Sequence, residues 1–198
     1  MTFSTVPVTP ASVTVLRARP EALVDAARVL ANETGDAAFT VAQVTARAGC
    51  SLKTFYRCFR GKDDLLLALL ATESRTGADL LAERLGDRTG PGALGAFTAE
   101  LFAMLRLPGA AGYAGVLARE HLRLGEHHDT ELRAALAPLL ELLAARLGTE
   151  TAARDAEIVF GVLLGGIRDV VFGRVGDLDV HAAALARFCC GGVWGAWR

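Results

Sequence analysis

The stretch from residue 39 to residue 65 decides the fold; it reads FTVAQVTARAGCSLKTFYRCFRGKDDL. Its apolar residues recur at helical spacing in two short runs, which Gly49 separates. Thr40 and Ser51 are good N-caps for the two helices, and glycine adopts the left-handed backbone of a tight turn at little cost. The pattern predicts two short helices joined by a turn, a helix-turn-helix over residues 40–59.

The second short helix has an apolar face and a polar face. Phe55 and Phe59 are four residues apart and are predicted to point inward together. The other positions combine small, polar and basic side chains, which suits a helix that enters the major groove of DNA. These outward positions are Ser51, Leu52, Lys53, Thr54, Tyr56 and Arg57.

The same region carries a concentrated positive charge. Residues 40–62 contain no Asp or Glu, although the 198-residue chain has a net charge of −1. A local basic patch on a near-neutral protein indicates attraction to phosphates at one place only. Arg47 and Arg60 can equally be plain solvated charges. The basic residues of the patch are Arg47, Lys53, Arg57, Arg60 and Lys62.

Helical periodicity continues on both sides of this stretch. No segment alternates with period two, so we expect an all-α fold of about nine helices and no sheet. Gly90-Pro91-Gly92 is expected to form a loop, and Pro138 is expected to kink its helix. The expected helices span residues 20–35, 41–48, 51–59, 62 onward, 93–106, 112–124, 130–147, 151–173 and 180–197.

The residues around the turn resemble those of the TetR family of bacterial transcriptional regulators. The resemblance covers about residues 17–74, and it is specific because many residue types agree at fixed offsets. The chain beyond it agrees with the family only in length and helical character. The matching residues are Thr40, Ala48, Gly49, Thr54, Phe55, Tyr56, Phe59, Lys62 and Leu65.

The resemblance implies an organisation in three parts. Residues 1–16 would form a flexible arm, and residues 17–76 a three-helix DNA-binding head that contains the helix-turn-helix. Residues 77–198 would form a helical body for effector binding and dimerisation. Arg17 and Arg19, where the arm meets the first helix, would either enter the minor groove or belong to a solvated tail.

The resemblance also implies roles in DNA binding. Thr40 would cap its helix and touch a phosphate, and Lys62 would hold a phosphate together with a helix N-terminus. Thr54 and Tyr56 would contact the backbone or base edges. The candidates for base reading begin the recognition helix: Ser51, Leu52 and Lys53. Cys50 and Lys53 depart from the usual family pattern.

Two C-terminal helices are predicted to form a dimer interface. Residues 157–173 are apolar around nearly the whole circumference, so this helix needs cover on more than one side. The last helix repeats the pattern, and glycines in both would let backbones approach closely. A single-chain core is the alternative. The predicted interface residues are Gly161, Gly165, Gly166, Phe188, Gly192 and Trp194.

The middle helices are then expected to enclose an effector pocket. The effector would be small and at least partly apolar, because the candidate lining is mainly apolar and aromatic. The predicted lining residues are Phe97, Phe102, Met104, Tyr113, Leu117, Arg119 and His121.

Histidine spacing argues against a metal site. His121, His127 and His128 lack the spacing of four residues with which one helix chelates a metal, and Gly125 interrupts them. A polar loop is the simpler interpretation, and metal sensing is the alternative. We expect no metal and no cofactor.

The four cysteines match no zinc pattern and indicate a reduced, intracellular protein. Cys189 and Cys190 are expected to be buried and inert, with an oxidation sensor as the alternative. The longest apolar runs are too short to span a bilayer, so no membrane association is expected and the location would be cytoplasmic.

No catalytic motif rises above background, so the chain is not expected to be an enzyme. The predicted function is sequence-specific DNA binding by a homodimeric transcriptional regulator. It would be a repressor that a small, partly apolar effector releases from a palindromic operator. The alternative is a helical protein that binds or converts small molecules without binding DNA.

Overall fold

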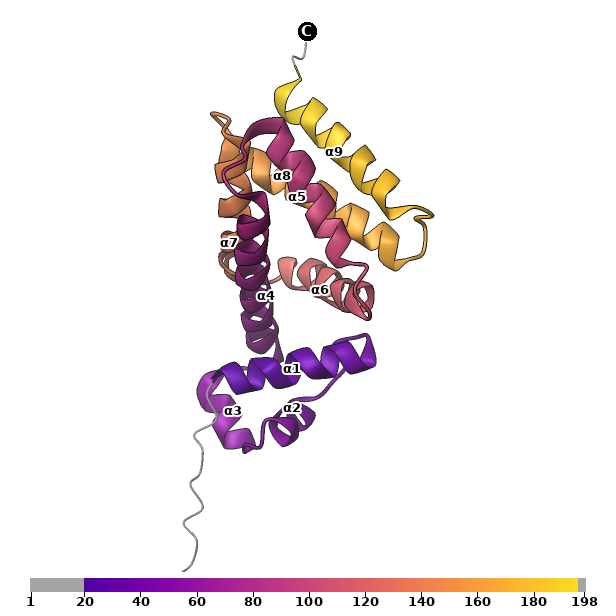
Figure 1. Ribbon diagram of the computed structural model, residues 1–198. Coiled ribbons are helices and arrows are strands. Elements are labelled where there is room, and N and C mark those ends of the chain that lie inside the picture. Colours follow the sequence, from indigo (N-terminus) through magenta and orange to yellow (C-terminus); the bar gives the residue numbers. More distant parts are fainter. Residues whose placement is uncertain (1–19, 196–198) are drawn as a thin grey trace, which may run out of the picture.

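The computed structural model describes residues 20–195, which fold into nine α-helices without a strand (Figure 1). The predicted arm at residues 1–16, Arg17, Arg19 and the predicted last turn around Trp197 lie outside the described residues. The helices are α1 (Pro20–Thr34), α2 (Val41–Arg47), α3 (Leu52–Cys58), α4 (Lys62–Leu85), α5 (Gly90–Met104), α6 (Ala110–Gly125), α7 (Asp129–Leu147), α8 (Ala152–Val171) and α9 (Leu178–Trp194).

The predicted helices are confirmed in number and order, with one difference in detail. The expected loop at residues 90–92 is wrong, because α5 already begins at Gly90. Pro91 sits in the first turn, where its missing N–H costs no helical hydrogen bond. Helix α7 runs on through Pro138. The next amide, that of Leu139, donates to the buried Ser74 Oγ at 3.3 Å, which gives this N–H a partner beside the proline.

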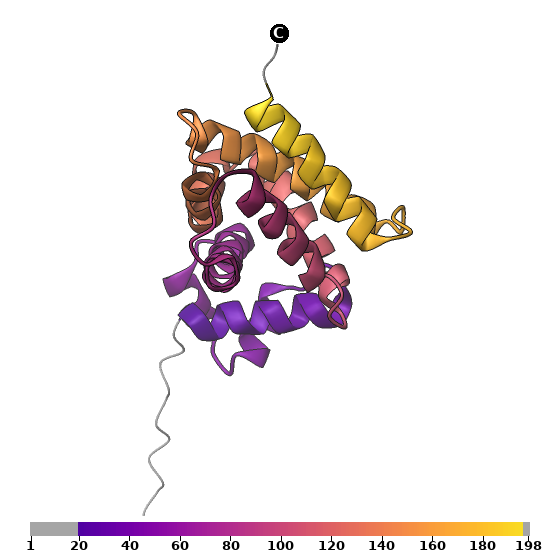
Figure 2. The same ribbon diagram turned by 45° about the horizontal axis from the view of Figure 1, so that its top comes forward.

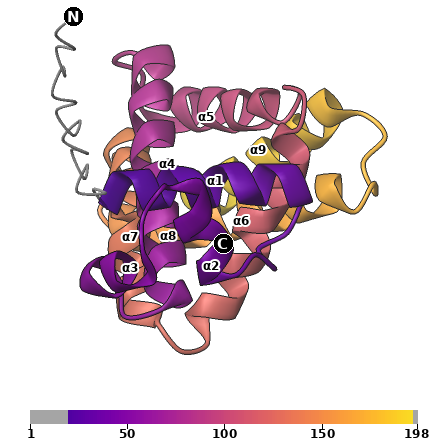
Figure 3. The same ribbon diagram turned by 90° about the horizontal axis from the view of Figure 1, so that it is seen from below.

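Helices α1, α2 and α3, with the start of α4, form the head of the molecule (Figure 1). Seen from the head end, α1 crosses in front of α4, and α2 and α3 lie nearest the viewer (Figure 3). Leu23, Val44 and Phe55 are fully buried in the core that these helices share. The head core therefore brings together one apolar face from each of its short helices.

Helix α4 connects the head to the body, which comprises α5 to α9 (Figure 1). Its first half supplies Leu65 and Leu69 to the head core, and its second half supplies Leu81 and Leu85 to a separate body core. The predicted domain boundary after residue 76 falls inside this helix. A displacement of α4 would therefore move residues of both the head core and the body core.

In the body, α4 packs against α5, α6 and α7. Helix α7 runs beside α4, and α5 lies along α9 on the outer side of the body (Figures 1 and 2). Helix α8 contacts α6, α7 and α9. Helix α6 lies at the end of the body nearest the head and also contacts α1. Within residues 20–195, none of the helices combines the length and hydrophobicity that a membrane span requires.

Gly166 allows α8 and α9 to pack closely. A Cβ added there would lie 2.9 Å from Phe102 Cζ and would collide with Leu185 Cδ1. By contrast, a Cβ at Gly95 in α5 would meet no heavy atom within 4 Å.

Gly166→Ala is expected to lower the free energy of unfolding by about 1–3 kcal/mol, because the Leu185 side chain and the fully buried Phe102 ring must shift to admit the methyl group. Gly95→Ala is the matched control, and it is expected to raise stability by up to about 1 kcal/mol through helix propensity alone. Urea denaturation of both variants followed by circular dichroism measures the difference. Equal stabilities of the two variants would refute the close approach at Gly166.

Candidate nucleic-acid interface and ligand cavity

Side-chain caps fix the two helices of the helix-turn-helix. Thr40 Oγ1 accepts the Gln43 amide at 3.2 Å, and Gln43 Oε1 accepts the Thr40 amide at 2.7 Å, which completes a capping box. The predicted N-cap role of Thr40 is confirmed, although the reciprocal bond from Gln43 was not foreseen. Gly49 has φ +65°, as a tight turn after α2 requires.

Ser51 caps the recognition helix α3. Its Oγ accepts the Thr54 amide at 3.1 Å and lies 3.0 Å from Thr54 Oγ1. Both hydroxyls therefore stabilise the start of α3 as well as lying on its exposed side. Phe59 and the fully buried Phe55 hold the opposite side in the head core.

The outer side of α3 is not covered by any other part of residues 20–195. Tyr56 is 60% exposed and Leu52 is 49% exposed, which is unusual for large side chains on a packed helix. Lys53 and Arg57 are also exposed, and within residues 20–195 neither forms a salt bridge. The predicted contact residues Ser51, Leu52, Lys53, Tyr56 and Arg57 thus share one accessible surface, with Thr54 half-buried beside them.

The two arginines whose role the sequence left open are paired with carboxylates. Arg47 lies 2.6 Å from Glu33, and Arg60 lies 2.7 Å from Asp64. Lys53 and Arg57 therefore carry the unpaired charge of the candidate interface.

Lys62 is turned toward the head. Its Nζ donates to the Ala37 carbonyl oxygen and lies 4.8 Å from the centre of the Phe39 ring. Because an ammonium group has three hydrogens, this bond leaves others for a phosphate. In this structure Lys62 ties the start of α4 to the loop between α1 and α2.

A mainly apolar cavity of about 310 Å³, here called the body cavity, lies among α4, α5, α6, α7 and α8. Four of the seven residues predicted for an effector pocket line it: Met104, Tyr113, Leu117 and His121. The structure does not bring the other three into its wall.

Phe97, Phe102 and Arg119 lie elsewhere. Phe97 and Phe102 are fully buried in the body core, where Phe102 packs against Gly166 and the His181 ring. Arg119 is exposed, and its guanidinium donates to the Gly35 carbonyl oxygen at 2.7 Å. This hydrogen bond links α6 to the head.

Polar groups from three helices meet at the wall of the body cavity. Glu73 Oε1 accepts a 2.6 Å hydrogen bond from Arg28 Nε of α1 and a 3.1 Å bond from the Tyr113 hydroxyl of α6. Burial, with the adjacent carboxylate, raises the pKa of Tyr113 far above its ordinary value, so the phenol stays protonated. Sequence analysis missed Arg28 and Glu73, which lie 45 positions apart in the chain.

His121 lies in the same wall, with its ring 6.1 Å from that of Phe160. Burial lowers the pKa of His121, which favours the neutral imidazole. Its Nδ1 is buried without a hydrogen-bond partner. His128 instead lies 3.5 Å from Asp63, and no group of His, Cys, Asp or Glu in the described part of the chain is arranged to hold a metal ion.

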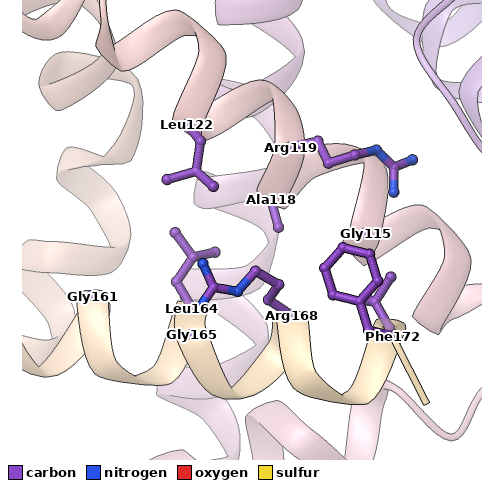
Figure 4. A pocket seen from close by; sticks show the side chains of 10 residues that line it. Gly115, Ala118, Arg119, Leu122, Gly161, Leu164, Gly165, Arg168 and Phe172 are labelled. Atoms are coloured by element: carbon purple, nitrogen blue, oxygen red, sulfur yellow. The ribbon is translucent and has the colours of Figure 1, made fainter. Parts of the chain in front are cut away.

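A groove of about 250 Å³ runs between α6 and α8, and its glycines come from both helices (Figure 4). Gly161 and Gly165 lie on the α8 side together with Arg168 and Phe172, facing Ala118 and Leu122 of α6. A Cβ at either of these two glycines would meet no heavy atom within 4 Å. They are therefore available for contact with another molecule.

The other predicted interface residues divide in two groups. Phe188 is 69% exposed and Gly192 is exposed, both on α9. Gly166 faces the chain's own core, and Trp194 is half-buried against that core, so these two belong to intramolecular packing. Cys189 is buried, and burial raises the pKa of its thiol to about 11.

Comparison with known families and structures agrees with this architecture. Residues 23–69 match the family of bacterial regulatory proteins named tetR. Comparison with curated proteins finds no significant match.

Several solved structures share the fold over nearly the whole chain. A TetR transcriptional regulator from Rhodococcus sp. RHA1 has a TM-score of 0.74 and 17% identity, covering 92% of this chain and 98% of that one. The regulator FadR from Bacillus subtilis, in complex with stearoyl-CoA, has a TM-score of 0.68 and 18% identity, covering 90% and 100%. The multidrug binding protein EbrR, complexed with ethidium, has a TM-score of 0.67 and 23% identity, covering 88% and 98%.

At such low identity the structural likeness establishes the fold alone, and the family match is confined to residues 23–69 in the head. That match spans α1 to the first part of α4 and includes the capped helix-turn-helix with its exposed recognition surface. The head of this chain, over residues 23–69, is thus similar to the family of bacterial regulatory proteins named tetR, and the whole described chain shares the fold of solved TetR regulators.

Proposed function

We propose that the chain acts as a homodimeric repressor that binds a palindromic operator and is released by a small, partly apolar effector. The observation that carries the proposal is the recognition helix α3, whose exposed side combines Lys53, Tyr56 and Arg57 while Phe55 anchors the other side. Such a surface suits a major groove, where side chains reach base edges and phosphates together.

The effector site in this proposal is the body cavity. Its volume is at the lower end of the range for small-molecule sites, and its wall is mainly apolar. The solved relatives FadR and EbrR hold stearoyl-CoA and ethidium respectively. The cavity borders α4, whose first turn leads directly into the head, so an occupant that shifts α4 would reorient α3.

The homodimer in this proposal forms through α8 and α9. Ile158, Gly161, Gly165 and Phe172 follow helical spacing along α8, and Ile158 and Phe172 are both more than half exposed. Val180 and Phe188, large and exposed, share one face of α9 by the same spacing. A two-fold axis through these faces would give two recognition helices and hence a palindromic site.

Genome-wide recovery of DNA fragments bound by the purified protein tests the proposal. Recovery of fragments that share a palindrome, with binding that weakens as salt rises, is the expected result. Absence of sequence-preferring, salt-sensitive binding to every fragment would contradict it. It would then favour the alternative, a helical protein that binds small molecules without DNA.

Two recognition-helix variants should behave differently on the recovered operator. Lys53→Ala is expected to lower affinity about tenfold and to relax the preference at one base pair, because Lys53 begins the recognition helix and is a candidate for base reading. Tyr56→Ala is expected to weaken all sequences alike, because a backbone contact carries no sequence information. Fluorescence anisotropy with operator and singly substituted operators separates the two.

Arg75→Ala serves as the matched control for these variants. Arg75 is exposed on α4 beyond the head core, so its loss removes a charge without touching the recognition surface. Its operator affinity should stay within about twofold of the unmodified protein at physiological salt. A Lys53→Ala variant that keeps full preference would remove Lys53 from base reading.

A further inference from the structure

We propose that Arg28, a residue of the head, sets the ligand class of the body cavity. By neutralising Glu73, it makes the cavity selective for uncharged, mainly apolar molecules that carry a hydroxyl group, such as phenols and alcohols. The inference rests on the proposed function in one respect, namely that the body cavity is the effector site.

The wall of the body cavity contains a single charged residue among the described residues. That residue is Glu73, and leucine, alanine, methionine and phenylalanine side chains make up most of the remainder. A lone carboxylate in an apolar wall would select a cationic ligand, because the desolvated charge needs a counter-charge. The contacts of Glu73 decide whether it is such a carboxylate.

Glu73 already has its counter-charge. Arg28 Nε donates to Glu73 Oε1 at 2.6 Å, and the Glu73 side chain is 24% exposed while that of Arg28 is 31% exposed. The pair is therefore largely screened from solvent. A cationic ligand would have to approach a carboxylate whose charge a guanidinium offsets. An anionic ligand would face the carboxylate itself, so either kind of ion would lose hydration without gaining a full counter-charge.

The same cluster offers hydrogen bonds to a ligand hydroxyl. Tyr113 donates its only hydrogen to Glu73 Oε1 at 3.1 Å, so its phenol oxygen can accept one from a ligand. The second carboxylate oxygen, Glu73 Oε2, takes part in none of the hydrogen bonds within residues 20–195 and can accept one as well. A hydrocarbon of the same shape would leave both acceptors without a donor.

Four test ligands of similar size distinguish the classes. Thymol is an uncharged phenol, and p-cymene is its skeleton without the hydroxyl. Benzyltrimethylammonium is an aromatic cation, and cuminate is an aromatic anion. Isothermal titration calorimetry of the full-length protein at about pH 8, where carboxylates are ionised, gives the four dissociation constants.

The unmodified protein is expected to bind thymol about tenfold more tightly than p-cymene, because one hydrogen bond to the cluster is gained. It is expected to bind benzyltrimethylammonium and cuminate more weakly than thymol. Tighter binding of the cation than of thymol would overturn the proposal, because Glu73 would then act as an unpaired carboxylate. Binding of none of the four would overturn it too.

Arg28→Gln is the decisive variant. It removes the guanidinium, so benzyltrimethylammonium is expected to gain at least tenfold in affinity and to overtake thymol. Glu73→Gln is the mirror variant, which leaves Arg28 paired only with the exposed Asp25, 2.5 Å away, and is expected to improve cuminate binding instead. Either reversal supports the proposal, so a folding defect in one variant leaves the other as a test.

Arg28→Lys and Arg75→Gln are the matched controls. The first keeps the positive charge beside Glu73 and should retain the preference for thymol, whereas the second removes an exposed charge from α4 outside this cluster. An unchanged order of affinities in both Arg28→Gln and Glu73→Gln would overturn the proposal. Operator binding by the same preparations, measured by anisotropy, reports separately on the proposed function.

Discussion

Replacing Phe55 by alanine is expected to lower the free energy of unfolding by about 3–5 kcal/mol and to abolish operator binding. Phe55 is fully buried, and its ring lies 5.7 Å from that of Phe59 and 5.3 Å from that of Tyr56. Removing the ring leaves a void under a helix of only seven residues, which cannot hold its shape without tertiary contacts.

Tyr56→Ala is the neighbouring control for this prediction. Tyr56 is 60% exposed, so truncating it should cost less than about 1 kcal/mol of stability while operator affinity still falls. Guanidinium denaturation monitored by circular dichroism measures stability, and anisotropy measures DNA binding. If Phe55→Ala lost less than about 1 kcal/mol, the ring would not be the anchor of the recognition helix.

The helix-turn-helix could be predicted because its determinants are local. An N-cap hydroxyl, a glycine with positive φ and two phenylalanines four residues apart act within a few positions of the chain. Thr40 and Gln43 have the three-residue spacing of a capping box, which the sequence analysis did not predict. Here short-range physics and tertiary structure agree.

The cavity lining could be predicted only in part, because an apolar residue on a helix serves a core or a cavity equally well. Phe102 and Met104 lie two positions apart in α5, yet Phe102 fills the body core while Met104 faces the body cavity. Which face of α5 meets which neighbour is set by α8 and α9, far away in the chain. The Arg28–Glu73 pair could not be predicted either, because it joins side chains of α1 and α4 that lie 45 positions apart in the chain.

Adjacent glycines make the same point for the predicted dimer interface. Gly165 and Gly166 follow each other in α8, but an added Cβ would touch neighbouring side chains only at Gly166. A helix that is apolar on every side needs contacts with its own chain on one side and with a partner on another. The sequence alone does not show which residues face which. Gly161 and Gly165 line the groove between α6 and α8, where contact with the second protomer is proposed.

Phe188→Glu is expected to convert the proposed homodimer into monomers and to weaken operator binding about 100-fold or more. Phe188 is 69% exposed in the single chain, so the substitution should leave the fold intact. In a dimer through α9, the glutamate would be buried without a counter-charge, which costs several kcal/mol. A monomer also loses the second recognition helix, and with it the gain from linking two binding events.

Val29→Glu provides the matched control, because Val29 is also exposed but lies on α1 in the head rather than on α8 or α9. Light scattering after size-exclusion chromatography should find this variant dimeric and Phe188→Glu monomeric at the same concentration. If Phe188→Glu stayed dimeric, pairing through α9 would be excluded. If it became monomeric but bound the operator with unchanged affinity, one head would suffice, and the palindromic operator would lose its physical basis.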